Sequence, residues 1–129
     1  MTIIDTSFMV DFLKGAPDAV GKMKELIGND RAAITIITCY ELLKGASLSS
    51  RKEENLAEVT KAISSMEVID LSLEACAEAA EIYHELKEDG CLIGEFDIII
   101  AAIARANHEA LLTRDQHFKS VQELNIVKW

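Results

Sequence analysis

Cysteine, proline and long apolar runs are all scarce in this chain of 129 residues. Its three cysteines are far apart and show no CxxC or zinc-ligand spacing, which argues against a disulfide framework and a structural zinc. The longest apolar run, residues 98–104, is too short to cross a bilayer, and the first residues lack the basic and apolar stretches of a signal peptide. We therefore expect a soluble, cytoplasmic protein without a membrane anchor, in which residues 1–129 form a single domain.

Positive charge and aromatic rings are also in short supply. The chain has 13 lysines and arginines against 22 acidic residues, a formal net charge of −9, and only 5% of its residues are aromatic. That balance argues against a protein that holds nucleic acid or an anionic membrane by bulk electrostatics. The scarcity of rings also predicts little recognition of bases by stacking.

Apolar, β-branched runs alternate with helical patterns along the whole chain. The predicted strands are residues 2–4, 32–37, 67–71, 110–113 and 125–128. The predicted helices are residues 7–13, 17–27, 38–44, 50–64, 72–88 and 95–107, with a turn at residues 28–30 and a short helical turn around Phe118. Because the strands are continuously apolar, they predict a central, mainly parallel sheet of about five strands that is covered on both faces. The expected fold is therefore a three-layer α/β/α sandwich.

Local signals predict where several helices begin and what they face. Thr6 is expected to cap the first helix, and residues 38–41 and 50–53 both have the spacing of a capping box. Helix 72–88 carries glutamates along one face, which we expect to be solvated. Helix 95–107 is apolar almost all round and is expected to be buried.

Four carboxylates fall where such a fold gathers its functional groups. Asp5 and Asp115 follow the first and fourth predicted strands, while Glu41 and Asp97 lie in the first turns of two predicted helices. In a parallel α/β sheet, the carboxyl ends of the strands and the helix N-termini that follow them share one edge. We therefore expect Asp5, Glu41, Asp97 and Asp115 to converge, although they are spread over most of the chain.

Each of these acids also has a simpler explanation, as a helix cap or as a first-turn residue favoured by the helix dipole. Four like charges packed beside apolar strands, however, repel one another unless a cation neutralises them. Mg²⁺ and Mn²⁺ prefer carboxylate oxygens and water, and such sites suit phosphoryl transfer by an activated water. We therefore interpret the four acids as catalytic ligands of one or two of these ions. The neighbouring hydroxyls of Thr6, Ser7 and Thr113 are expected to orient them.

Four short motifs resemble those of the PIN-domain nucleases and occur in the same order. They are IDTS at residues 4–7, YELLKG at residues 40–45, GEFD at residues 94–97 and LTRD at residues 112–115. Each motif is weak on its own, but the four together are specific, and the resemblance covers essentially the whole chain. The closest resemblance is to the VapC-type toxins of bacterial and archaeal toxin–antitoxin pairs.

This resemblance implies a Mg²⁺- or Mn²⁺-dependent endoribonuclease that cleaves RNA, forms a homodimer and is blocked by a small VapB-type antitoxin. It assigns the metal and catalytic roles to Asp5, Glu41, Asp97 and Asp115, which we call the acidic quartet, with support from Thr113. Some relatives carry a further acid after the last motif. Here Gln116 and His117 occupy that stretch, so the fifth ligand is missing and the choice between one ion and two stays open.

Arg114 and Lys44 are candidate RNA contacts, although either could be an ordinary solvated charge. Two other enzyme classes fit less well. The first motif lacks the second aspartate of a haloacid-dehalogenase-type phosphatase, and no Gly-rich turn follows the first strand as a dinucleotide site requires. The alternatives left open are a PIN-domain nuclease of RNA processing outside a toxin pair, and a non-catalytic PIN module that binds RNA or protein.

Overall fold

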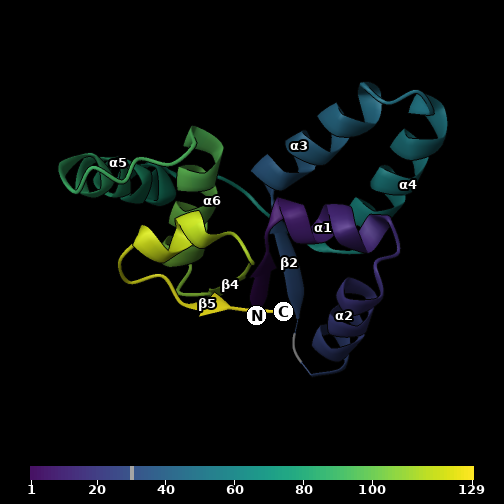
Figure 1. Ribbon diagram of the computed structural model, residues 1–129, viewed down its shortest axis with the longest axis horizontal. Coiled ribbons are helices and arrows are strands. Elements are labelled where there is room, and N and C mark those ends of the chain that lie inside the picture. The colour runs from purple at the N-terminus through teal and green to yellow at the C-terminus, as the bar shows by residue number, and fades with distance from the viewer. Residues whose placement is uncertain (30) are drawn as a thin grey trace.

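The computed structural model describes residues 1–29 and 31–129 and shows a parallel sheet between two layers of helices (Figure 1). The strands are β1 (Thr2–Ile4), β2 (Ala32–Thr35), β3 (Glu67–Ile69), β4 (Ala110–Leu112) and β5 (Ile126–Val127). They lie in the order β3-β2-β1-β4-β5, and every neighbouring pair is parallel. The predicted α/β/α sandwich with a five-stranded sheet is confirmed.

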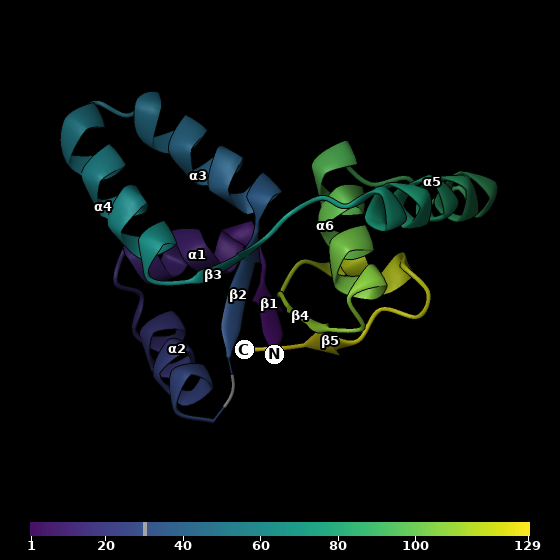
Figure 2. The same cartoon turned by 180° about the vertical axis from the view of Figure 1, so that it is seen from behind.

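Each face of the sheet is covered by its own group of helices (Figures 1 and 2). One face carries α1 (Thr6–Leu13), α2 (Pro17–Asn29), α3 (Ile36–Ser47) and α4 (Lys52–Ser64). The other carries α5 (Leu73–Glu88), α6 (Glu95–Ala106) and the 3₁₀ helix η1 (Gln116–Ser120).

Two hydrophobic cores hold these layers together, because consecutive strand residues point to opposite faces. In β1, Ile3 enters the core under α5 and α6, whereas Ile4 enters the core under α1 to α4. In β4, Leu111 and Leu112 divide in the same way. Strands that are apolar at every position are therefore what this sandwich requires.

Helix α6 is buried over most of its length, as its sequence predicts. Ile98 and all of residues 100–104 are at most 1% exposed, and they pack into the α5–α6 core. No helix in the described part of the chain is both long and apolar enough to cross a membrane.

The main departure from the predicted elements lies at the end of β2. We expected a strand through residue 37, but β2 stops at Thr35 and α3 begins at Ile36. The Thr35 hydroxyl accepts a hydrogen bond of 3.1 Å from the Thr38 N–H and so caps α3. The capping box predicted at residues 38–41 is therefore wrong, and Glu41 lies in the second turn of α3 rather than the first.

Other predicted helix starts are also wrong. Helix α1 begins at Thr6, so Asp5 occupies the cap position and the Thr6 hydroxyl bonds elsewhere. Arg51 precedes α4 without a side-chain cap bond, so the box at residues 50–53 does not form. Helix α2 continues through residue 29, which removes the first two residues of the turn predicted at 28–30; the third, Asp30, lies outside the described residues.

The acidic face of α5 is not fully solvated, contrary to expectation. From α6, Arg105 places Nε 2.5 Å from Glu78 Oε2, and its terminal nitrogens lie 3.6 Å from Glu85 and 3.8 Å from Glu81. Nη1 also donates to the Gln122 carbonyl at 3.1 Å. The Arg105 side chain is only 9% exposed, so this group, the Arg105 cluster, joins α5, α6 and the segment before β5.

The direction of the chain across the sheet reverses between β1 and β4. From β1 the chain moves outward through β2 to β3, and it then returns to β4 on the other side of β1. Such a reversal leaves a crevice at the carboxyl ends of the two central strands. Asp5 directly follows β1 and Thr113 directly follows β4, so the predicted site residues begin at this crevice.

Candidate active site

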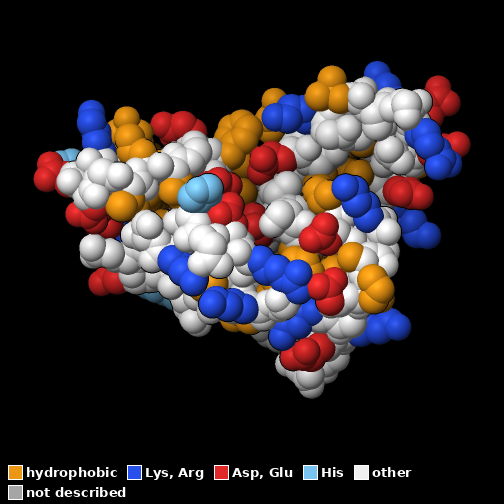
Figure 3. Space-filling model, viewed as in Figure 1, with side chains coloured by type: hydrophobic (Ala, Val, Ile, Leu, Met, Phe, Trp, Pro, Cys, Tyr) orange, Lys and Arg blue, Asp and Glu red, His pale blue; other side chains and the backbone are white. Residues whose placement is uncertain are grey.

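The structure brings the acidic quartet together at this crevice. Asp5 and Asp115 follow β1 and β4, Glu41 comes from α3, and Asp97 lies in the first turn of α6. Burial, and then the charges of Asp5, Asp115 and Glu41, raise the pKa of Asp97 to about 6, partly offset by His117. Figure 3 shows acidic side chains gathered in a hollow near the middle of the front face. Four separate segments thus bring their carboxylates within electrostatic range of one another.

Asp5 is the most buried of the four acids, with an exposed fraction of 4%. Its Oδ2 atom accepts hydrogen bonds from the Ser7 hydroxyl at 2.9 Å and the Thr113 hydroxyl at 2.8 Å. Its N–H donates to the Leu112 carbonyl at 3.1 Å, and its side chain makes no cap bond to α1. Helix capping therefore does not explain Asp5, whose Oδ1 atom accepts no hydrogen bond from the described residues.

A chain of threonine hydroxyls holds Glu41. Thr6 Oγ1 donates to Glu41 Oε1 at 2.9 Å and lies 3.0 Å from Thr38 Oγ1. Thr38 is fully buried and is in turn held by Thr35, so the support reaches back to the end of β2. Thr6 was predicted to orient the acids, whereas Thr38 was not. The available signal was the spacing of three residues between Thr38 and Glu41, which places both on one helix face.

Asp115 and Asp97 have contrasting surroundings. Asp115 Oδ1 accepts a hydrogen bond of 2.9 Å from the His117 N–H, and it lies 3.0 Å from His117 Nδ1. Asp115 thus caps η1, which confirms the simpler explanation of this residue as a helix cap. The exposed imidazole of His117 also faces the Asp115 carboxylate. Asp97 is half-buried, and neither of its oxygens accepts a hydrogen bond from the described residues.

This set of donors fits a hard divalent cation such as Mg²⁺ or Mn²⁺. None of the described residues donates a hydrogen bond to Asp5 Oδ1 or to either oxygen of Asp97, so these atoms are available to an ion; burial, and then the charges of the other three acids, raise the pKa of Asp97. Within residues 1–29 and 31–129, no three His, Cys, Asp or Glu side chains already form a metal-ligand group. Because Mg²⁺ keeps several waters and needs only one or two direct carboxylates, a shell completed by water suits this arrangement.

The two candidate RNA contacts have different surroundings. The Arg114 guanidinium bonds Asp18 Oδ2 and the backbone oxygen of Trp129, each at 2.6 Å, and stacks 3.5 Å from the Trp129 ring centre. The hydrogen bond from Arg114 lowers the pKa of Asp18. Arg114 is therefore engaged within the fold.

Lys44 is exposed and lies beside an aromatic pair at the rim of the crevice. Its Nζ atom is 5.3 Å from the Tyr40 ring centre and 5.8 Å from that of Phe96. The two rings meet edge to face with their centres 5.6 Å apart. Because Tyr40 and Phe96 directly precede Glu41 and Asp97, this pair bridges α3 and α6 next to the quartet.

Known proteins share the sequence pattern of this chain. Residues 2–124 match the PIN domain. The chain belongs to the PIN-domain family. The family predicted from the four short motifs is therefore confirmed.

The similar proteins of this PIN-domain family include VapC ribonucleases. Ribonuclease VapC2 of Rickettsia felis is 32% identical over 98% of this chain and 96% of its own length. The tRNA(fMet)-specific endonuclease VapC of Salmonella typhimurium is 30% identical over the same shares of the two chains. The crystal structure of VapBC2 from Rickettsia felis bound to a promoter DNA fragment has a TM-score of 0.93, at 29% identity over 99% of this chain and 98% of that one. The predicted resemblance to VapC-type toxins is confirmed.

Proposed function

We propose that this protein is a metal-dependent endoribonuclease and the toxin of a VapBC-type toxin–antitoxin pair. One observation carries the proposal: four carboxylates from four segments meet at the sheet crevice of a PIN-domain chain, and hydroxyls already hold two of them. A purely structural role does not require this, because clustered acids without a cation destabilise the fold.

We propose Asp5, Glu41, Asp97 and Asp115 as the residues that hold one or two Mg²⁺ or Mn²⁺ ions. When bound, such an ion would activate a water molecule for attack on the RNA phosphodiester and offset the charge of the phosphate. The residues of the chain prepare the site. Ser7 and Thr113 fix one oxygen of Asp5, and no other described residue donates to its second oxygen. Thr6 does the same for Glu41.

Cleavage of a defined RNA with and without metal tests this proposal. We expect cleavage in Mg²⁺ or Mn²⁺ and none with chelator, and we expect Asp97→Asn to lower kcat/KM at least a hundredfold. The matched control is Asp89→Asn, which removes the same charge from the exposed end of α5 and should cleave like the wild type. Equal rates for Asp97→Asn and the wild type would overturn the assignment.

The antitoxin is proposed to cover the groove beside Glu41. A cavity of about 300 Å³ lies between α1, α3 and α4, with Leu13, Leu42 and Val59 among its lining residues and Glu41 at one side. A largely apolar groove whose lining also holds the carboxylates of Glu41 and Glu58 and one lysine, Lys14, suits a partner segment with apolar side chains and a cation. The related structures from Rickettsia felis and Salmonella typhimurium are VapBC complexes.

Expression of the chain should arrest growth, and the product of an adjacent short reading frame should relieve the arrest and co-purify with it. Growth without arrest would favour an RNA-processing role.

We also propose that the protein forms a homodimer. Large apolar side chains are exposed on α3, in the segment before α6 and in the first turn of α6, and two of them, Tyr40 and Phe96, are in contact. They are Ile36, Tyr40, Leu43, Leu92 and Phe96. Exposed apolar patches of this kind mark association surfaces. The pair Tyr40→Ser/Phe96→Ser should convert a dimer to a monomer in light scattering, whereas Leu73→Ser, an exposed leucine on α5, should not. A monomeric wild-type protein would contradict this proposal.

A further inference from the structure

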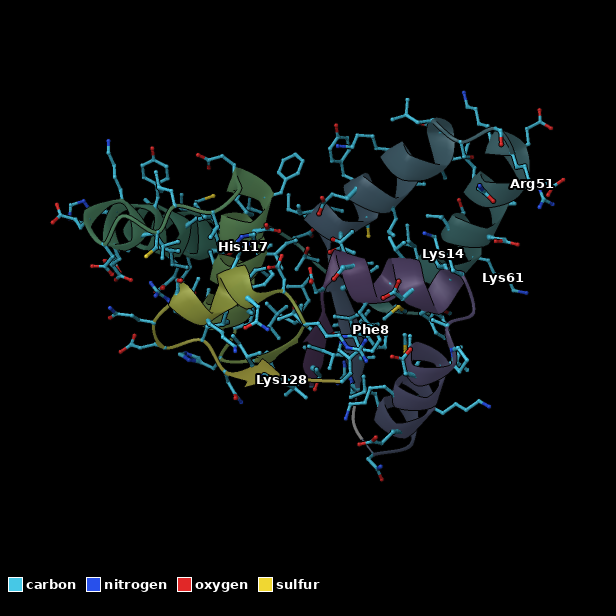
Figure 4. The ribbon with its side chains drawn as sticks, viewed as in Figure 1. Phe8, Lys14, Arg51, Lys61, His117 and Lys128 are labelled. Atoms are coloured by element: carbon cyan, nitrogen blue, oxygen red, sulfur yellow. The ribbon has the colours of Figure 1, made fainter. Side chains whose placement is uncertain are left out.

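A small basic cleft borders the acidic quartet on the side of η1 and β5. It has a volume of about 250 Å³, and it is lined by Thr113 and Asp115 of the candidate site together with Lys119 and Lys128. Figure 3 shows lysine and arginine side chains gathered on this face, below the acidic hollow, and Figure 4 places Lys128 on the same side of the molecule as His117. We call this cavity the lysine cleft. It brings a carboxylate of the quartet and two lysines to one surface.

The two lysines are the available charges of the lysine cleft. Arg114 also lines the cavity, but its guanidinium is already bound to Asp18 and to the backbone of Trp129. In the described part of the chain, neither Lys119 nor Lys128 forms an ion pair, although Asp115 borders the same cavity. Two exposed ammonium groups that form no ion pair with a described residue therefore lie beside the acidic quartet, in a protein with a net charge of −9.

The contents of the cleft follow from its charge and its size. Lysines repel the divalent cations that the quartet attracts, so the cleft is not an extension of the metal site. Lysine ammonium groups bind phosphate as point charges, and the amide of Gln116 adds a neutral donor to the same cavity. The volume lies below the roughly 300 Å³ of ordinary small-molecule pockets, which suits one phosphodiester group rather than a whole nucleotide.

We propose that the lysine cleft binds a backbone phosphate of the RNA substrate, next to the phosphate that is cleaved at the acidic quartet. The inference rests on the proposed ribonuclease function and adds a substrate subsite to it. Because Thr113 and Asp115 border both the candidate site and the cleft, a strand bound at the quartet would have Lys119 and Lys128 within reach of a neighbouring phosphate. The cleft supplies the attraction for RNA that the overall charge of the protein lacks.

Binding of single-stranded RNA by Lys119→Gln/Lys128→Gln tests the proposal, with both changes made in an Asp97→Asn background that does not cleave. We expect the Kd to rise about tenfold, and the slope of log Kd against log salt to fall by about 0.7 for one lost phosphate contact. The matched control is Lys24→Gln/Lys61→Gln, which changes the net charge equally through exposed lysines of α2 and α4. Lys61 lies beside α4 toward the right of the view in Figure 4, away from Lys128 at β5. The control should stay within about twofold of its parent.

A neutral methylphosphonate placed at one RNA linkage at a time identifies the phosphate concerned. At one position near the cleavage site, the methylphosphonate should weaken binding by the parent protein about as much as the two lysine substitutions do. The same methylphosphonate should not weaken binding by the lysine variant any further. In cleavage by the otherwise wild-type chain, the lysine change should raise KM more than it lowers kcat.

The outcomes separate this proposal from the proposed function. If the wild-type chain cleaves RNA and the lysine variant binds like the charge-matched control, the lysine cleft is not a phosphate subsite. The proposal would also be overturned if the loss of affinity from the methylphosphonate added to the loss from the lysine substitutions at every position. The lysines would then act only through the electrostatic field of the whole protein. A wild-type chain that cuts no RNA in Mg²⁺ or Mn²⁺ would instead overturn the ribonuclease function itself.

Discussion

Asp97 differs from the other acids of the quartet in receiving no hydrogen bond from the described residues. Asp5 and Glu41 are held by hydroxyls and Asp115 by the His117 N–H, whereas Asp97 faces burial and three like charges. Its pKa is raised from 3.8 to about 6 for that reason. At neutral pH, a bound cation would therefore relieve the repulsion on Asp97.

This difference predicts how the metal-free protein responds to pH. A pKa of about 6 means that the folded chain holds the Asp97 proton more tightly than the unfolded chain does. Stability should therefore fall as the pH rises from about 4 to about 6 and stay lower above that range. Asp97→Asn removes this loss of stability. At pH 7.5 with chelator, the free energy of unfolding of the variant in urea should therefore exceed that of the wild type by about 1 kcal/mol, a value reduced to allow for solvent screening. The two curves should approach each other near pH 4. A variant less stable than the wild type at pH 7.5 would instead favour a structural role for Asp97 at the start of α6.

Thr6 gives a second prediction at this scale. Thr6→Val keeps the shape of the side chain but removes the hydroxyl that donates to Glu41. We expect kcat/KM to fall about tenfold and the Mn²⁺ concentration for half-maximal activity to rise, because the carboxylate loses its orientation. Thr6→Ser restores the hydroxyl and should recover most of the activity. Thr60→Val, at an exposed threonine of α4, is the matched control. If the serine variant were as slow as the valine variant, the methyl group rather than the hydrogen bond would be the important contact.

Among the secondary-structure elements, α5 and α6 are joined by a charged group inside an otherwise apolar contact. Arg105 is nearly buried and neutralises glutamates that come from three positions of α5. Arg105→Met would leave these glutamates without their cation, so we expect a loss of about 3 kcal/mol in the free energy of unfolding. Arg51→Met removes an exposed arginine paired with Glu54 and should cost less than about 0.5 kcal/mol. Urea unfolding of both variants measures the difference. Equal stabilities would show that the Arg105 cluster behaves like a surface ion pair.

The helices and strands also show what the sequence could predict and what it could not. Continuous apolar strands and the apolar surface of α6 are local patterns, and both led to the correct layers. The end of β2 was placed too late because Ile36 and Ile37 favour a strand, while the structure starts a helix at the Thr35 cap. The local cap by Thr35 marks that boundary, and it places Glu41 in the second turn of α3 rather than the first without removing it from the site.

The partners of the site were harder to foresee than its acids. An acid after an apolar strand is visible in the sequence, so Asp5 and Asp115 could be proposed at once. The bond between Thr113 and Asp5 joins residues 108 positions apart, and it depends on β4 lying beside β1. The Arg105 cluster and the lysine cleft likewise depend on helix and strand placement, which no local spacing reveals.

For the molecule as a whole, the net charge of −9 includes four carboxylates that lie where a cation would relieve their repulsion. A metal that binds the folded state alone should therefore stabilise the entire domain. Saturating Mn²⁺ should raise the melting temperature by roughly 5–10 °C above the value in chelator. Asp5→Asn/Asp97→Asn should show little of this rise, whereas Glu74→Gln/Glu88→Gln, on the exposed face of α5, should retain it. An unchanged melting temperature of the wild type would count against the metal site.

The central position of β1 also links the folding of the sheet to the assembly of the candidate site. Asp5 is fully held only when Thr113 lies beside it, directly after β4. The segment before residue 110 contains Asp5, Glu41 and Asp97 but lacks both Thr113 and Asp115. The pairing of β4 with β1 and the completion of the site are therefore one event in folding.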